Sequence, residues 1–247
     1  MADQEKKNVT IQVPLSFGDI AAFSKLIREI RFENRFFLSE VPTKFVAGLI
    51  KYAKQFKIHQ FSASSRFYRA RVHEFKMVEP HYSPEQMGSP PAHKTTHGRL
   101  NPVGIPYLYL ASNIDTAVSE VRPWIGCNIT AAEFTLNRDI SVVNFSKNVF
   151  TNVPSGTEYA AAETTWLELI TFMFSMPFDP RDDTAYMATQ YVTERIKKEG
   201  FDGILYDSAL NKDGYNITLF DHSIAKPGKL LKIDVQSISY DNKVFEL

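Results

Sequence analysis

The sequence has little of what disulfides, metal clusters or membrane spans require. Its single cysteine, Cys127, can form neither an internal disulfide nor a cysteine-rich zinc site. Lys and Arg number 28, as do Asp and Glu, and this net charge of +0 disfavours binding to nucleic acid or to an anionic membrane. The most apolar stretch, residues 166–178, is short and is interrupted by Glu168. We therefore expect a cytoplasmic protein that neither crosses nor binds a membrane.

The residues that are present suit one sizeable core. A chain of 247 residues with a hydrophobic share of 44% is long and apolar enough for a globular domain. The pattern changes at Arg66, where helical periodicity gives way to short β-prone runs. We expect a helical segment over residues 1–65 and a mixed domain over residues 66–247.

Two helices are predicted before residue 60. In the first, apolar residues recur at helical spacing after the candidate caps Ser16 and Asp19. These apolar residues are Ile20, Phe23, Ile27 and Ile30. The second helix is expected to begin at Pro42, because proline suits a first helical turn, and its apolar stripe is Phe45, Leu49, Ala53 and Phe56. The resulting helical hairpin offers a surface for a regulatory partner or a second subunit.

Strands and further helices follow without a regular order. Strands are predicted at residues 67–72, 107–111, 128–136, 140–144, 203–206, 217–220 and 230–238. Helices are predicted at residues 157–176 and 185–199, the second ended by Gly200. Because no regular alternation of strand and helix appears, the sequence favours an α+β fold over a doubly wound sheet.

Residues 79–106 form a long stretch rich in Pro, Gly, His and Ser that has no periodicity. Connections of this length in compact domains are usually functional or disordered. Within it, two glycines and two prolines surround Arg99 in the segment 98–106. Glycine lets a backbone approach a ligand closely and proline fixes its path, so Arg99 suits the binding of a planar anion. A plain surface arginine on a turn fits the same pattern.

The strand predicted at residues 107–111 leads to a short helix that Ser112 or Asn113 can cap and that Pro123 stops. Glu120 lies on the flank of the buried stripe of this helix, in its last turn. A negative charge there meets the negative end of the helix dipole at a cost of roughly 0.3–1 kcal/mol. Such a tolerated cost favours a functional carboxylate, and the alternative is a glutamate screened by Arg122 or by solvent.

The combined spacing of these segments resembles one family. Residues 98–120 contain Gly98-Arg99-x-Asn101-Pro102-x-Gly104-Ile105-Pro106-x-x-Tyr109-x-Ala111, then Thr116-Ala117 and Glu120. This order is similar to the signature of the RES family, which is named for its Arg, Glu and Ser. Three further blocks agree with it: Tyr68-Arg69, Gly200-Phe201-Asp202-Gly203-Ile204-x-Tyr206-x-Ser208, and Asn216-x-x-x-Phe220. The more widespread pattern has glycine and tryptophan where this chain has His97 and Leu100, and the Asn101-Pro102 form preceded by Pro90-Pro91 resembles a subgroup.

The resemblance implies a fold like that of ADP-ribosyltransferases and cleavage of the nicotinamide–ribose bond of NAD, which is substrate rather than cofactor. It implies that Arg99 holds the phosphates or the nicotinamide ribose of NAD, that Tyr109 packs on nicotinamide, and that Glu120 binds a ribose hydroxyl. These three residues are the predicted catalytic set. Further contacts to NAD are predicted from Tyr68, Arg69, Asn101, Ser208 and Asn216.

Physical chemistry supports these roles. Departure of nicotinamide leaves a ribose with oxocarbenium character, so a fixed carboxylate stabilises charge that appears only in the transition state. An arginine is planar, always charged and bidentate, which suits a pyrophosphate better than the point charge of lysine. An aromatic ring such as that of Tyr109 can stack on flat nicotinamide.

Three hypotheses follow from the resemblance. The first is a NAD glycohydrolase or phosphorylase that passes ADP-ribose to water or inorganic phosphate and acts as a toxin or defence effector. The second is an ADP-ribosyltransferase that modifies a protein or nucleic acid, and the third is a non-catalytic module that binds NAD or a partner. The intact set of Arg99, Tyr109 and Glu120 weighs against the third. Candidate partners are NAD, phosphate, an antitoxin or other regulatory protein, and a second copy of the chain.

No metal site is predicted. His81, His93 and His97 share the long loop, but no Cys, Asp or Glu cluster completes a zinc site around them. The acidic run that ends at Asp183 lacks the glycine and the terminal glutamate of a calcium loop. Ser208 lacks the glycine-flanked turn of a nucleophilic serine. Tyr186, on the helix predicted at residues 185–199, is interpreted as a core residue.

Overall fold

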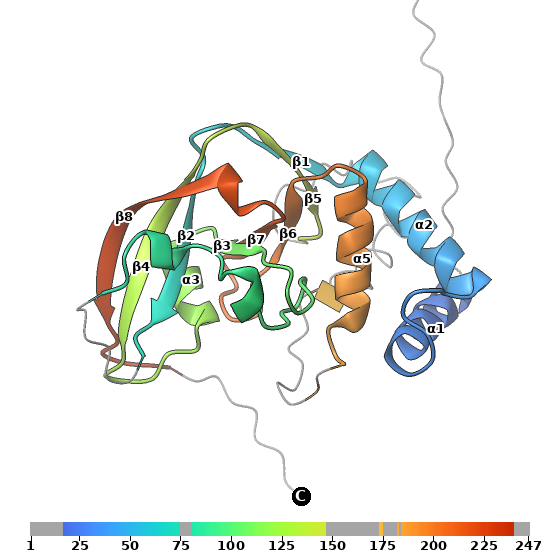
Figure 1. The fold of residues 1–247 in the computed structure, drawn as a ribbon, viewed down its shortest axis with the longest axis horizontal. Helices are drawn as coiled ribbons and strands as arrows, with labels where there is room; N and C mark the ends of the chain where they lie inside the picture. Colours follow the sequence, from blue (N-terminus) through green and yellow to red (C-terminus); the bar gives the residue numbers. More distant parts are fainter. Residues whose placement is uncertain (1–16, 75–80, 147–172, 175–181, 183, 240–247) are drawn as a thin grey trace, which may run out of the picture.

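An eight-stranded mixed sheet runs through the protein (Figure 1). The structure is a computed structural model that describes residues 17–74, 81–146, 173–174, 182 and 184–239. Its strands are β1 (Ile58–Phe61), β2 (Arg66–Val72), β3 (Leu108–Ala111), β4 (Asn128–Leu136), β5 (Ile140–Asn144), β6 (Gly203–Asp207), β7 (Tyr215–Leu219) and β8 (Ala225–Asp234). They lie in the order β1-β5-β6-β7-β3-β2-β4-β8, and among these pairs β5 and β6 run parallel while the others are antiparallel. The predicted α+β class is confirmed.

The sheet begins earlier in the chain than predicted. β1 lies within the segment expected to be helical and pairs with β5, with Ile58 opposite Val143. The sequence did not predict this strand, because two polar residues, His59 and Gln60, separate its two apolar ones. β8 also begins five residues before its predicted start. The sequence did not predict these first residues because Pro227 and the neighbouring lysines make this part of the edge strand polar.

The predicted helical hairpin is confirmed as α1 (Phe17–Phe32) and α2 (Glu40–Phe56). α2 begins two residues before Pro42, after Ser39, whose hydroxyl donates to the Glu29 carboxylate at 2.7 Å. Ile20 was expected in the buried stripe of α1 but is 48% exposed, and the buried face is formed by Ala22, Phe23, Leu26 and Ile30. The helix predicted at residues 157–176 falls outside the described residues except at 173–174, as does the side chain of Phe56.

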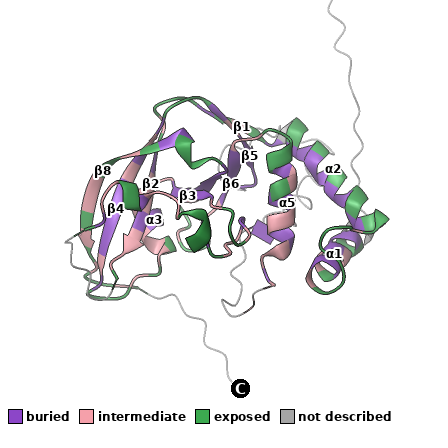
Figure 2. Cartoon of the chain, in the orientation of Figure 1, coloured by how far each residue is buried: buried purple, intermediate pink, exposed green. Residues whose placement is uncertain are grey.

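One face of the sheet, here called the helical face, is covered by α1, α2 and α5 (Met187–Lys198) (Figure 1). One continuous hydrophobic cluster joins these helices to Phe145 beyond β5 and to Ile204 of β6. Figure 2 shows buried positions along the central strands and exposed ones on the outer turns of α2 and α5. The hairpin therefore shares its core with the sheet. Among the described residues, no helix combines the length and apolar character needed to cross a bilayer.

The opposite face of the sheet is covered by the first part of the irregular segment 81–106 and by the turn before β8. Tyr82 and Met87 from that segment are buried against the strands, and Leu100 at its other end is buried in the cluster of the helical face. Two short 3-10 turns, at Glu85–Met87 and Ala92–Lys94, are its regular elements. Residues 81–106 are thus packed, which argues against a floppy insertion.

Candidate functional site

Strand register places a set of polar side chains on the helical face of the sheet. Tyr206 of β6 lies opposite Asn216 of β7, and Asn216 lies opposite Ala111 of β3. Tyr109, two residues before Ala111, shares their face because side chains alternate along a strand. The sequence pattern alone cannot give this register, because Tyr109 and Asn216 are more than a hundred residues apart.

Glu120 stands beside this row at the end of α3 (Ile114–Glu120). The helix begins as predicted, with Asn113 as its cap, and the Asn113 side chain accepts a hydrogen bond from the Thr116 amide at 2.8 Å. Glu120 Oε1 accepts two hydrogen bonds of 2.7 Å, one from Ser208 Oγ and one from Asn216 Nδ2. The residue is exposed, and within the described part of the chain no cation pairs with it. Glu120 is therefore not paired with Arg122, and both of its hydrogen bonds from described residues go to Oε1.

Ser208, which follows β6, is fixed by its own hydrogen bonds. Its hydroxyl oxygen accepts the backbone amides of Leu210 at 3.2 Å and Asn211 at 3.1 Å, while its proton goes to Glu120. A hydroxyl has one donor and two acceptor positions, so all three are used. Ser208 is therefore a support for the carboxylate, and its geometry does not suit a nucleophile. Glu120, Ser208 and Asn216 are called the Glu120 cluster below.

The loop that carries Arg99 is built on the phenol of Tyr109. Tyr109 donates to Asn101 Oδ1 at 2.8 Å and accepts from the Leu100 amide at 3.1 Å, and burial raises the pKa of this phenol. Gly98 is required beside it, because an added Cβ would lie 2.9 Å from the Tyr109 hydroxyl and 2.4 Å from Asn101 Oδ1. The hydroxyl of Tyr109 thus holds the loop, and its ring remains as the part that can stack on a ligand.

Asn101 was predicted to contact NAD, and the structure gives it a different set of partners. The side chain is buried, and its Nδ2 donates to the carbonyl oxygens of Thr96 at 3.0 Å and Pro102 at 3.1 Å. Its Oδ1 accepts from Tyr109. Both amide hydrogens are therefore used, and Asn101 stabilises the loop from within instead of facing a ligand.

Helix α5 holds the other side of the same loop. Gln190 Nε2 donates to the carbonyl oxygens of Gly98 at 2.8 Å and Asn101 at 3.1 Å, and the Thr189 hydroxyl donates to the carbonyl oxygen of Arg99. The Arg99 guanidinium carbon lies 5.4 Å from the ring centroid of Tyr186, a cation–π arrangement. Tyr186, interpreted from the sequence as core, therefore contacts the predicted ligand-binding arginine.

Tyr206 lies beside the Glu120 cluster, because it is opposite Asn216 in the sheet. Its side chain is buried on the helical face, and burial raises the pKa of its phenol to about 12. Smaller effects on that pKa come from Thr218 and Arg99, which lower it, and from Glu120, which raises it. The sheet brings Glu120 and the Arg99 loop to one face, because Asn216 of β7 donates to Glu120 while Tyr109 of the neighbouring β3 binds the loop.

The structure does not bring Arg69 to this row. Tyr68 lies opposite Ala111 and Glu133 and shares the helical face, with its hydroxyl 3.4 Å from the Glu133 carboxylate. Arg69, the next residue, points to the opposite side of the sheet, and its Nη1 donates to the backbone oxygen of Tyr109 at 3.3 Å. Burial lowers the pKa of Arg69 to about 10. Its observed role is to bridge β2 and β3 behind the predicted site.

Three residues of this arrangement were not predicted from the sequence. Tyr206 was seen only as part of a motif, although its spacing of two from Ser208 places both on one side of a strand. Tyr186 and Gln190 gave no signal, because α5 meets the Arg99 loop only in the folded chain.

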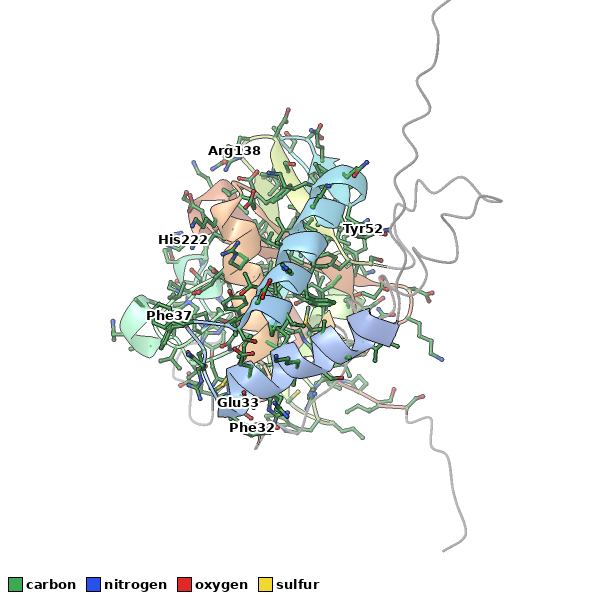
Figure 3. All side chains as sticks on the ribbon, turned by 90° about the vertical axis from the view of Figure 1, so that its right-hand side faces the viewer. Phe32, Glu33, Phe37, Tyr52, Arg138 and His222 are labelled. Atoms are coloured by element: carbon green, nitrogen blue, oxygen red, sulfur yellow. The ribbon has the colours of Figure 1, made fainter. Side chains whose placement is uncertain are left out.

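Two shallow hollows lie away from these residues. One of about 470 Å³ is bordered by Arg138, Lys197, Asp202 and His222, and the other, of about 430 Å³, is bordered by α2 and Glu199. In Figure 3 Arg138 and His222 lie toward the upper part of the molecule and Phe32 at its lower edge. No group of three or more metal-binding side chains is found among the described residues. The Glu120 cluster and the Arg99 loop therefore remain the candidate site.

The fold and the candidate site define a class: an α+β protein in which one face of a mixed sheet carries a carboxylate held by two hydrogen bonds and a packed loop that bears an arginine. The RES domain family matches residues 66–241, and the chain belongs to this family. None of the curated proteins compared with the chain matches it. Among solved structures, the M. tuberculosis MbcT–MbcA toxin–antitoxin complex is similar at 13% identity and a TM-score of 0.44, over 76% of this chain and 92% of that one.

Proposed function

We propose that this protein cleaves NAD at the nicotinamide–ribose bond and transfers ADP-ribose to water or inorganic phosphate. Membership of the RES family supports an enzyme that acts on NAD. The observation that carries the proposal is that two neighbouring strands bring both groups to one face of the sheet: Asn216 of β7 donates to Glu120, and the phenol of Tyr109 on β3 holds the loop that carries Arg99. A fixed cation and a fixed anion in one place suit a ligand that has a pyrophosphate at one end and a ribose at the other.

Glu120 is the group proposed to stabilise the reaction's charge. As nicotinamide leaves, positive charge develops on the ribose, and a carboxylate already fixed by Ser208 and Asn216 needs no reorganisation to meet it. Both of those hydrogen bonds go to Oε1, so Oε2 is the oxygen that would face a ribose hydroxyl or the anomeric carbon. The bond between the ribose carbon and the nicotinamide nitrogen breaks with its electron pair going to nitrogen, so nicotinamide leaves neutral. A phosphate oxygen, or a water that releases one proton to solvent, forms the new bond to that carbon.

Depletion of NAD would arrest growth, which is how a toxin or a defence effector of this kind would act. Such an activity requires control, and an antitoxin or other regulatory protein is the partner we propose. Control by a partner is testable separately from the chemistry itself.

The direct test is incubation of the purified protein with NAD, with and without inorganic phosphate, followed by identification of all products by mass. Nicotinamide with free ADP-ribose would show hydrolysis, and nicotinamide with a phosphorylated ADP-ribose would show phosphorolysis. Label that appears on a protein or nucleic acid would instead show a transferase. If NAD stays intact in all conditions, the proposed function is wrong.

Removing the guanidinium of Arg99 should weaken NAD binding more than it slows the chemical step. In Arg99→Ala the loss of charge-assisted hydrogen bonds to pyrophosphate should raise KM for NAD by about 10- to 100-fold. Arg99→Lys keeps the charge but lacks the planar guanidinium, so its KM for NAD should lie between those of the wild type and Arg99→Ala. Steady-state kinetics checks this, and a KM unchanged in Arg99→Ala would exclude a phosphate contact.

Removing one hydroxyl tests the role of Tyr206. In Tyr206→Phe the loss of one buried hydroxyl beside the Glu120 cluster should lower kcat/KM for NAD roughly 3- to 10-fold. Tyr107→Phe is the matched control, because its buried hydroxyl has no hydrogen-bond partner in the described structure. Equal activity of both variants would show that the Tyr206 phenol takes no part.

A further inference from the structure

An arginine of the N-terminal hairpin reaches the start of α5. Arg31, in the last turn of α1, pairs through Nη2 with Asp182 Oδ2 at 2.6 Å and donates through Nε to the Thr184 hydroxyl at 2.9 Å. Asp182 in turn accepts the Thr184 amide at 3.0 Å and its hydroxyl at 2.6 Å. Figure 3 shows the neighbouring Phe32 at the end of α1, exposed to solvent. The side chains of Arg31 and Asp182 are 24% and 35% exposed, so the pair is partly buried and less screened by solvent than a fully exposed ion pair.

This turn determines where α5 begins. Tyr186, the residue before the helix, makes no side-chain capping hydrogen bond. The amide of Met187 instead donates to the Thr184 carbonyl oxygen at 3.1 Å, and the amide of Ala185 to the Asp182 carbonyl oxygen at 3.1 Å. Asp182 and Thr184, which accept these bonds, are the two residues that Arg31 of α1 contacts. The first turn of α5 is therefore positioned by α1.

The first turn of α5 is also the part that holds the Arg99 loop. Tyr186 lies under the Arg99 guanidinium, and the side chains of Thr189 and Gln190 bind three carbonyl oxygens of residues 98–101. A continuous series of contacts therefore joins Arg31 to Arg99 through Asp182, Thr184 and α5. Arg31 lies outside the residues that the RES family matches.

We propose that Arg31 is a positioning residue for NAD binding, which acts through Asp182, Thr184 and α5 on the loop that carries Arg99. The helical hairpin is then part of the working site, although it is remote from the Glu120 cluster. The identity of the ligand rests on the proposed function, whereas the mechanical link does not. A displacement of a binding group by even one ångström is enough to weaken its contribution.

The test compares Arg31→Gln in the full-length chain with Arg28→Gln, which breaks the exposed Arg28–Glu33 pair on the same helix. We expect Arg31→Gln to raise KM for NAD about 3- to 10-fold with kcat within about twofold, and Arg28→Gln to change neither. Arg31→Lys, which keeps the pair with Asp182, should restore part of the affinity. Asp182→Asn should reproduce the effect, and combining it with Arg31→Gln should add little.

Hydrogen exchange gives a readout that needs no NAD. In Arg31→Gln, exchange of the backbone amides at residues 98–104 should become faster while exchange in β4 and β7 stays unchanged. An unchanged KM, equal exchange at residues 98–104, or uniformly faster exchange throughout the chain would overturn the proposal. If the wild type leaves NAD intact while the exchange result holds, the proposed function fails and the mechanical link stands.

Discussion

The Glu120→Gln variant is expected to cleave NAD on the order of 10³-fold more slowly than the wild type, with little change in stability. Glutamine keeps an oxygen that can accept the hydrogen bonds from Ser208 and Asn216, so the site should stay assembled. What it loses is the negative charge that opposes the developing charge on ribose. Single-turnover rates with nicotinamide release as the signal give the measurement.

Asp115→Asn is the matched control for this variant. Asp115 is an exposed carboxylate in the first turn of the same helix, so its replacement removes an equal charge from α3 without touching the Glu120 cluster. We expect this control to retain full turnover. Comparable rates in the two variants, or a wild-type rate in Glu120→Gln, would remove Glu120 from the mechanism.

A methyl group at position 214 should damage both the fold and the site. A Cβ on Gly214 would lie 1.9 Å from Thr116 Oγ1 and 2.9 Å from Thr116 Cβ. Thr116 is fully buried in α3 and is held by Asn113, so it cannot move aside. Gly214→Ala should therefore push α3 away from the turn that carries Ser208, at a cost of about 1–3 kcal/mol in stability and about 10- to 100-fold in activity.

Two comparisons isolate the cause. Gly48→Ala, on α2 where the added methyl meets no atom within 4 Å, should be neutral or stabilising by up to about 1 kcal/mol. Thr116→Ala combined with Gly214→Ala removes the closest clash, the one with Thr116 Oγ1, and should recover part of the lost activity. Thermal unfolding and NAD turnover, measured well below each melting temperature, provide the data. A Gly214→Ala variant as stable and active as the wild type would show that the close approach is not needed.

Local patterns in the sequence predicted the elements that have strong local signals. β4 and β5 appear over the predicted residues, the hairpin of α1 and α2 is present, and Gly200 ends α5 in a left-handed conformation with φ 88°. β1 was not predicted because its sequence has no alternation of apolar and polar residues. It is stabilised by pairing with β5, about eighty positions later in the chain. Sheet order depends on such distant pairings, which periodicity does not contain.

The sequence also predicted part of the candidate site and missed the rest. The motif and its resemblance predicted that Glu120, Ser208 and Asn216 belong to one site, and in the structure Ser208 and Asn216 both donate to one carboxylate oxygen of Glu120. The motif did not predict which of the site residues face a ligand and which only support other residues. Asn101 is saturated within the loop and Arg69 lies behind the sheet, and only the three-dimensional contacts reveal either fact.

The most direct test of the account is a crystal structure of Glu120→Gln bound to intact NAD. The account predicts a single NAD molecule whose pyrophosphate contacts the Arg99 guanidinium and whose nicotinamide ribose lies beside the side chain of residue 120. NAD bound away from the helical face of the sheet, or bound there without contact to both residues, would contradict it.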